Sequence, residues 1–313
     1  MDKVETAPSH QFVNSNQANK HTIASLFFDL KELFKGIVLV SNVLPVFAGF
    51  WLALYFTNAS IADYWGLMLV TLIGSMFVMA GALVLNNWYE VDLDTAMKRT
   101  ENRPTVTGSF SLNTVLAIGI SFSVLGFIVL SFTTLESIVY AFIGWFTYVV
   151  LYTFWTKRKY AMNTIIGSVS GAVTPLIGWA AIDSAFHVVP IVLFLLMFIW
   201  QVPHTFSIAM KRYDEYKAAG VPMHPVVYGF ASTKRQIFVY IACLLPLPFY
   251  LTEIGTPFVV LITLMNVGWL ALAIRGFFVK NDVKWSRVIF VYSLSYLTIF
   301  FLFIIVATTP IFS

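Results

Sequence analysis

The sequence predicts an all-α membrane protein with nine transmembrane helices around a central cavity that opens to the cytoplasmic side. Of its 313 residues, 59% are hydrophobic and 11% are charged, and the mean hydropathy is +0.81. Soluble domains carry roughly a quarter charged residues, so this composition indicates an integral membrane protein. Apolar runs of membrane-spanning length recur along the chain, and the cations between them alternate regularly.

The nine predicted spans are apolar runs of about 20 residues, the length that crosses the hydrocarbon core as a helix. They cover residues 36–56, 65–86, 112–132, 136–155, 163–182, 189–209, 235–252, 256–278 and 286–308. Pro175 in the fifth span and Pro203 in the sixth predict kinks. Kinked helices often line a cavity, because loose backbone polar groups are tolerated only there. Gly167 and Gly171 favour close helix packing in the fifth span.

The distribution of charge predicts the orientation in the membrane. With nine spans, all 19 lysine and arginine residues fall in the N-terminal segment or after spans two, four, six and eight. The opposite loops carry only acidic charges, at Asp63, Glu136, Asp183 and Glu253. Positive residues stay cytoplasmic, so the N-terminus is expected inside and the C-terminus outside. The net charge of +4 follows from this topology and does not indicate a nucleic-acid partner.

Residues 1–33 are expected to form a polar, partly disordered N-terminal segment, and residues 34–313 a single nine-helix domain. The beginning of the chain has neither the basic-then-apolar pattern of a signal peptide nor the composition of a transit peptide. We therefore expect a multi-pass protein of a bacterial plasma membrane. The single cysteine, Cys243, lies in the seventh predicted span, which excludes an intramolecular disulfide.

An acidic segment follows the second span without a spacer. Asn86, Glu90 and Asp94 are spaced i, i+4 and i+8, so they share one face of a helix. Carboxylates at this density favour a divalent cation, and Mg²⁺ binds one or two carboxylates together with phosphate oxygens. The alternative is a solvated loop, but charges at the edge of the hydrocarbon are costly and are retained for function or pairing. We expect these three residues to act in catalysis and metal binding at a diphosphate.

Three further carboxylates are candidates on weaker grounds. Asp92 would face about 200° away from Glu90 on a continuous helix, so a catalytic role requires the helix to end or a second function. Asp214 and Glu215 follow the sixth span and are adjacent, so they cannot share a helix face. They are interpreted either as a ligand for a second metal ion or as a charged interfacial turn.

Cations near both cytoplasmic loops suit phosphate oxygens, which guanidinium and ammonium groups bind through charge-assisted hydrogen bonds. The candidate diphosphate ligands are Lys98, Arg99, Arg103, Lys157 and Arg158. For the last two, which follow span four, the alternative is a simple positive-inside anchor.

His204 is the only histidine inside a predicted span, beside Trp200, Gln201 and the Pro203 kink. Imidazole is a natural ligand of iron, and this position predicts a cavity residue. The alternative is a hydrogen-bonded packing histidine, and the sequence leaves both possibilities open.

Five blocks in order resemble the intramembrane, UbiA-type prenyltransferase superfamily over nearly all of residues 30–305, most closely its haem-farnesylating members. The blocks are Asn86–Asp94 with Met97 and Arg99–Pro104, Tyr152–Arg158, Gly171–Trp179, Trp200–His204 and Asp214–Met223. An acidic motif alone would be typical of the whole superfamily, whereas five blocks in the same order are highly specific for its haem-farnesylating members.

The resemblance implies that farnesyl diphosphate alkylates a vinyl group of haem B, with water added, to give haem O and diphosphate. It implies Mg²⁺ as cofactor and haem as substrate, with the lipid bilayer and a downstream haem A synthase as partners. The implied metal ligands are Asn86, Glu90, Asp94, Asp214 and Glu215, and the implied haem-binding residues are His204, Trp200 and Gln201. Prenyl transfer to a quinone precursor or a chlorophyll-like ring is the alternative. A transporter is disfavoured, because the outer halves of the spans are almost entirely apolar.

Overall fold

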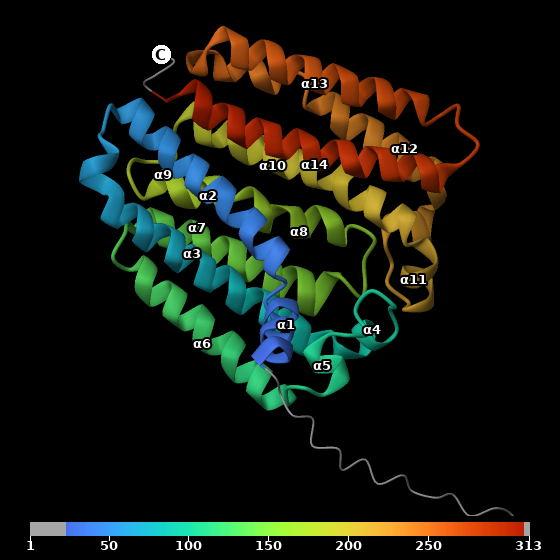
Figure 1. Ribbon diagram of the computed structural model, residues 1–313. Helices are drawn as coiled ribbons and strands as arrows, with labels where there is room; N and C mark the ends of the chain where they lie inside the picture. The colour runs from blue at the N-terminus through green and yellow to red at the C-terminus, as the bar shows by residue number, and fades with distance from the viewer. Residues whose placement is uncertain (1–22, 310–313) are drawn as a thin grey trace, which may run out of the picture.

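The computed structural model describes residues 23–309, which contain helices and no strands (Figure 1). The helices are α1 (Ile23–Leu33), α2 (Gly36–Thr57), α3 (Ile61–Tyr89), α4 (Val91–Thr95), α5 (Pro104–Thr107), α6 (Leu112–Leu130), α7 (Leu135–Phe146), the π-helix η1 (Thr147–Thr156), α8 (Asn163–Ala172), α9 (Thr174–Ala180), α10 (Val188–Lys211), α11 (Tyr213–Ala218), α12 (His224–Cys243), the 3₁₀ helix η2 (Leu247–Ile254), α13 (Thr256–Arg275) and α14 (Asp282–Ala307). Of the polar N-terminal segment predicted over residues 1–33, only α1 belongs to the described residues.

Eight segments of the described chain are long and apolar enough to cross a membrane. They are α2, α3, α6, α10, α13, α14 and the continuous segments Leu135–Thr156 and His224–Ile254. The predicted fifth span, 163–182, differs from the expectation because it forms two shorter helices, α8 and α9. Pro175 lies in the first turn of α9, where its missing N–H costs no intrahelical hydrogen bond. The break between α8 and α9 is consistent with the kink predicted at this proline.

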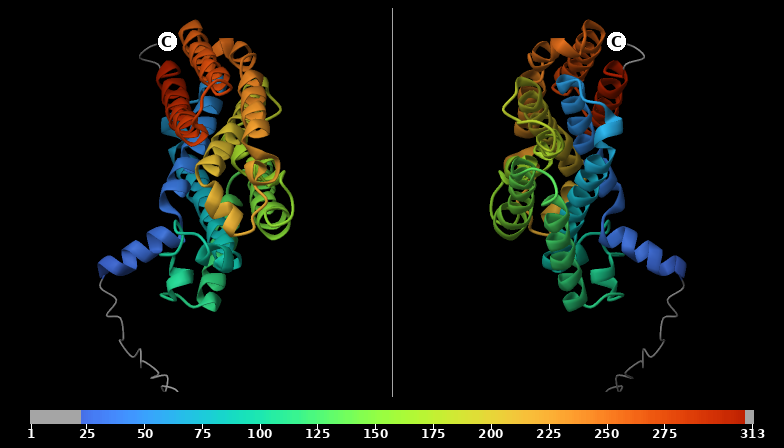
Figure 2. Two further views of the ribbon diagram at one scale, coloured as in Figure 1. Left: turned by 90° about the vertical axis from the view of Figure 1, so that its right-hand side faces the viewer. Right: turned by 90° about the vertical axis from the view of Figure 1, so that its left-hand side faces the viewer.

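The long helices run side by side, and α4, α5 and α11 gather at one end of the bundle (Figure 1). The acidic segments that follow α3 and α10 therefore lie at the same end. Helix α1 projects from the side of the bundle (Figure 2). A large hydrophobic core fills the space among α10, α12, α13 and α14, and its most deeply buried rings include Trp269 and Tyr296.

Helix α9 is fixed by close backbone packing against α2. A Cβ atom added at Gly178 of α9 would lie 1.9 Å from the carbonyl oxygen of Val46. A Cβ atom added at Gly49 of α2 would lie 2.0 Å from the carbonyl oxygen of Pro175. Small residues at such contacts let two helix backbones approach within van der Waals distance, which is the main packing device inside a membrane.

We expect Gly178→Ala to destabilise the protein, because the new methyl group overlaps the α2 backbone. Overpacking of this kind costs about 1–3 kcal/mol. Thermal unfolding in detergent measures the effect, and Gly66→Ala is the matched control because no atom lies within 4 Å of its added Cβ. An unfolding temperature of the Gly178 variant equal to that of the control would contradict the close packing.

Candidate active site

Two connected chambers open among α2, α3, η1, α8 and α10. The first, here called the polar chamber, has a volume of about 1090 Å³ that includes space open to solvent. Its polar lining includes Lys35, Asn86, Glu90, Asp94, Arg99, Arg103, Tyr152, Lys157, Gln201 and Tyr216. The second, here called the apolar chamber, has a wall that includes Leu39, Val78, Met79, Ala82, Ala141, Gly144, Trp145 and Ile177. The residues common to both linings are Val38, Asn42, Leu83, Tyr148, Ser170 and Gly171.

The C-terminal end of α3 carries the acidic face of the polar chamber. Glu90 ends α3 with φ −100° and ψ 15°, and α4 begins at the next residue. The helical register nevertheless continues, because the Glu90 N–H donates to the Asn86 carbonyl at 3.0 Å and the Asp94 N–H donates to the Glu90 carbonyl at 2.8 Å. Asn86, Glu90 and Asp94 therefore face the chamber together, with exposed fractions of 1%, 2% and 3%.

Both buried carboxylates are ion-paired to residues distant along the chain. Arg103 pairs with Asp94, and the Lys157 Nζ lies 2.5 Å from the Glu90 Oε2. Although burial opposes the charge, the Glu90 carboxylate raises the pKa of Lys157 above its ordinary value. The other Glu90 oxygen, Oε1, is buried and has no hydrogen-bond partner within the described part of the chain. An orphaned carboxylate oxygen in such a site is a suitable ligand for a divalent cation.

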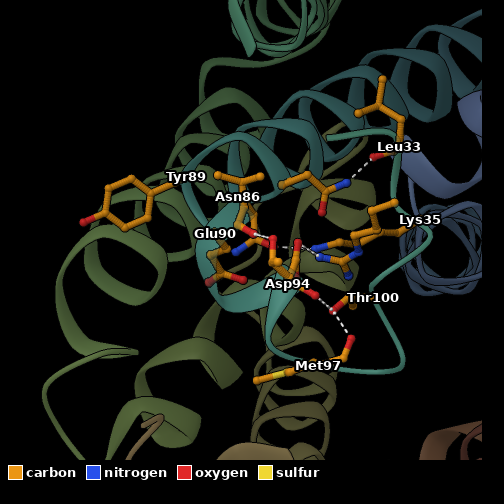
Figure 3. Close-up of polar contacts among 12 residues, drawn as sticks. Leu33, Lys35, Asn86, Tyr89, Glu90, Asp94, Met97 and Thr100 are labelled. Atoms are coloured by element: carbon orange, nitrogen blue, oxygen red, sulfur yellow. Dashed lines mark hydrogen bonds and ion pairs between the residues drawn. The ribbon is translucent and has the colours of Figure 1, made fainter. Parts of the chain in front are cut away.

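Lys35 is a further chamber cation that the predicted site did not include. It lies between α1 and α2 in the left-handed conformation (φ 48°, ψ 53°) and donates a hydrogen bond to the Asn86 Oδ1 (Figure 3). A non-glycine residue held in this region is strained, and such strain concentrates at functional sites. Burial, reinforced by the Arg103 charge, lowers the pKa of Lys35. The only sequence signal was a lone lysine directly before the first span.

The formal charge of the polar chamber is positive. Its described lining holds four cations and two carboxylates, which leaves two positive charges in excess. The excess favours an anion of at least two negative charges in a site whose low dielectric strengthens the attraction.

The π-helix η1 brings Lys157 to the chamber. In an α-helix, Tyr152 and Lys157 would lie about 140° apart, because each residue turns the helix by 100°. The i→i+5 hydrogen bonds of a π-helix place residues five apart on one face instead. The Lys157 N–H donates to the Tyr152 carbonyl at 2.9 Å, and its Nζ lies 5.4 Å from the centroid of the Tyr152 ring. Tyr148 and Tyr152 line the chamber with it.

Asp92 and Arg158 do not line the polar chamber, and their catalytic and diphosphate-binding roles stay predictions. Arg158 donates two hydrogen bonds of 2.7 Å to Asp92 and one of 3.0 Å to the Tyr89 carbonyl. The hydrogen bonds from Arg158 lower the pKa of Asp92, and the same pair raises the pKa of Arg158. The pair braces α4 against the end of η1. Asp92 faces away because it follows Glu90 by two residues, or about 200° of helix.

The cations after α4 are divided between solvent and chamber. Lys98 is exposed and does not line the chamber, whereas Arg99 and Arg103 both do. Arg99 is exposed and therefore lies toward the mouth, and Arg103 is buried beside Asp94.

Asp214 and Glu215 of the second acidic segment do not line the polar chamber, and their role as metal ligands stays a prediction. The Glu215 Oε2, like the Glu90 Oε1, is buried without a hydrogen-bond partner among the described residues. Asp214 is exposed, and Glu215 is paired with Arg212 at 2.9 Å within the same turn of α11. Tyr216 is the residue of this helix that lines the chamber. Residues 23–309 contain no group of three or more His, Cys, Asp or Glu side chains that could hold a metal ion. Of the five carboxylates predicted to act at the site, only Glu90 and Asp94 line the polar chamber.

The predicted haem-binding residues point to two faces of α10. Gln201 lines the polar chamber and donates to the carbonyls of Ser168 and Met197 at 3.1 Å each. Trp200 and His204, one turn apart, face α14 instead. The Trp200 Nε1 donates to the Ser293 carbonyl at 2.9 Å, and the His204 Nδ1 lies 2.8 Å from the Ser293 Oγ. The His204 ring stacks on Trp200, and neither residue lines the polar or the apolar chamber, so haem binding by these two residues stays a prediction.

Comparison with protein families and related sequences gives consistent matches. Residues 42–306 match the model of the UbiA prenyltransferase family. A protein of Oceanobacillus iheyensis named protoheme IX farnesyltransferase is 53% identical over 314 residues, covering 100% of both chains. Proteins of the same name from a Geobacillus species and Bacillus mycoides are 49% and 54% identical and cover 95% and 90% of this chain.

Solved structures share the fold at low sequence identity. A digeranylgeranylglyceryl phosphate synthase superposes with a TM-score of 0.73 at 18% identity, over 90% of this chain and 98% of the other. A UbiA homologue from Archaeoglobus fulgidus bound to DMAPP and Mg²⁺ superposes with a TM-score of 0.63 at 16% identity, over 87% and 99%. These likenesses support the helical fold independently of the sequence matches.

We expect Asp94→Asn to destabilise the protein by about 3–5 kcal/mol, because Arg103 is then buried without a counter-charge. Asp92→Asn is the matched control, and the loss of its half-exposed pair with Arg158 is expected to cost about 0–1 kcal/mol. Thermal unfolding of the two variants in detergent makes the comparison. Equal stability of the two variants would show that the buried pair carries no special weight.

Proposed function

Because the chain belongs to the UbiA prenyltransferase family, we propose that it transfers the farnesyl group of farnesyl diphosphate to a vinyl group of haem B, with water added, giving haem O and diphosphate. The observation that carries this proposal is full-length identity of 53% to a relative named protoheme IX farnesyltransferase. The paired chambers support it chemically, because a cationic compartment opens directly into an apolar one.

The diphosphate of the substrate binds in the polar chamber, where Lys35, Arg99, Arg103 and Lys157 converge. These cations stabilise the negative charge that grows on the leaving group as the bond to the prenyl carbon breaks. Positively charged groups fixed before the substrate arrives need little reorganisation in the transition state, which makes their stabilisation of the leaving group effective.

Mg²⁺ fits the donors at the end of α3, where Glu90 and Asp94 offer carboxylates and Asn86 an amide oxygen. The UbiA homologue solved with DMAPP and Mg²⁺ shows that a relative of this fold binds both groups. When bound, the metal would neutralise part of the diphosphate charge, which favours departure of the leaving group.

The farnesyl tail lies in the apolar chamber, with its reactive carbon at the boundary that Tyr148 shares with both chambers. The Tyr148 and Tyr152 rings face the allylic cation that ionisation produces, and aromatic faces stabilise such a charge. The vinyl group of haem attacks this carbon, and water adds to the resulting cation. Gln201 and Tyr216, from α10 and α11, line the wall that remains for the haem edge.

We further propose that α8 and α9 together make a ninth crossing within a single domain over residues 34–313. The 18 residues from 163 to 180 extend about 27 Å as a helix, close to the thickness of the hydrocarbon core. The N-terminus is then cytoplasmic and the polar chamber faces the cytoplasm of a bacterial plasma membrane, in line with the positive-inside rule. The haem O product passes to a haem A synthase.

We expect Asp94→Ala to abolish haem O formation, because it removes a carboxylate and frees Arg103 within the chamber. Mass spectrometry of haem extracted after expression measures the farnesylhydroxyethyl product, and membrane fractionation confirms insertion. Asp92→Ala, outside the chamber, should retain the product. Haem O at the normal level in the Asp94 variant would remove the diphosphate assignment, and prenylation of another aromatic acceptor alone would replace haem as the substrate.

We expect substrate affinity to fall with rising pH at the Lys35 pKa. The protonated amine binds the diphosphate, so affinity is full below the pKa of the free enzyme and is lost above it. Because burial lowers this pKa, the loss begins at a lower pH than for an ordinary lysine. Binding of farnesyl diphosphate as a function of pH measures this effect. Lys35→Arg, which stays charged, should move the alkaline loss to higher pH, and identical profiles would exclude Lys35 as the cause.

A further inference from the structure

One side chain lies between the apolar chamber and a groove on the outer surface of the bundle. Trp145 of α7 lines this chamber and also lines a groove on the outside of the bundle between α6 and α7. Among the described lining residues, no other is common to the two. The groove is open to lipid, because Ile120, Val124 and Phe142 on its walls are about half exposed.

The indole of Trp145 is held in place across the gap between the two helices. Its Nε1 donates a hydrogen bond of 3.0 Å to the Ser123 Oγ of α6, and that hydroxyl donates to the Gly119 carbonyl at 2.8 Å. The ring also stacks on Phe142, with centroids 6.4 Å apart. A hydrogen bond in apolar surroundings has no water to replace it, so the indole stays fixed.

The remaining chamber wall beside Trp145 is built from small residues. Ala82 and Ala141 are both buried there, and Gly144 precedes the tryptophan directly. Ala141 lies one helical turn before Trp145, so the two share the face of α7 that meets the chamber. The indole is consequently the bulky boundary on the side of the chamber that faces the groove.

We propose that Trp145 sets the length of the isoprenoid tail that the enzyme accepts. The closed wall confines a farnesyl tail, and a smaller residue joins the chamber to the groove, so that a longer tail extends between α6 and α7 into the bilayer. This inference rests on the proposed prenyl transfer and concerns the isoprenoid tail alone. The length of the tail that is transferred therefore tests it, whichever acceptor receives the tail.

The test compares geranyl, farnesyl and geranylgeranyl diphosphates as donors for the purified protein with haem B. We expect Trp145→Ala to raise the ratio of kcat/KM for geranylgeranyl over farnesyl by about tenfold or more, the scale on which apolar pockets discriminate added carbons. Trp145→Phe retains most of the bulk and should keep the wild-type preference. Ile120→Ala is the matched control, because Ile120 lines the groove and not the chamber.

A variant of opposite effect keeps the proposal falsifiable if Trp145→Ala does not fold. Ala141→Leu narrows the same wall, so farnesyl use should fall more than geranyl use. Binding of the non-transferable thiolodiphosphates of the three chains, measured by thermal stabilisation, should follow the same order. If a folded Trp145→Ala or Ala141→Leu protein keeps the wild-type preference among the three isoprenoid lengths, the proposal is overturned. Failure of the wild-type protein to prenylate haem while it prenylates another acceptor overturns the proposed function and leaves the tail comparison valid.

Discussion

Charge burial at the C-terminal end of α3 is the constraint on which the site depends. Glu90 and Asp94 are almost fully buried, and an unpaired carboxylate in such surroundings is very costly. Their partners come from different parts of the chain, since Arg103 follows α4 and Lys157 follows η1. The segment from α4 to α5 therefore folds back over the chamber, and η1 ends beside it. The ion pairs determine the shape of this end of the bundle.

The same pairing prepares the chamber for an anion. The lining carries more cations than carboxylates, and one oxygen of Glu90 has no hydrogen-bond partner among the described residues. Lys35 adds an amine whose pKa is lowered by burial. The negative charge of an incoming diphosphate favours the protonated form of this amine. In the proposed reaction, two of the groups that stabilise the leaving diphosphate, Arg103 and Lys157, are those that hold the carboxylates before the substrate binds.

Polarity changes with depth, and this gradient separates the two ends of the proposed donor substrate. Charged and amide groups lie at the end of α3, whereas the apolar chamber is lined by small residues such as Ala82 and Ala141. Gly171 borders both chambers, and a side chain there would collide with Gln201. The break between α8 and α9 lies along this wall, so irregular backbone occurs where a cavity is lined, as expected within a membrane.

Local sequence by itself determined eight of the apolar spans, because each is a run long enough to cross the hydrocarbon core. It also determined the shared face of Asn86, Glu90 and Asp94, which follows from helical periodicity. Tertiary structure alone decided which other residues meet that face. Lys157 reaches it through a π-helix, whose wider turn is invisible to a 100° periodicity. His204 faces α14 rather than the chamber, because α10 packs differently on its two sides. Such choices depend on contacts between helices far apart in the chain, which no local pattern encodes.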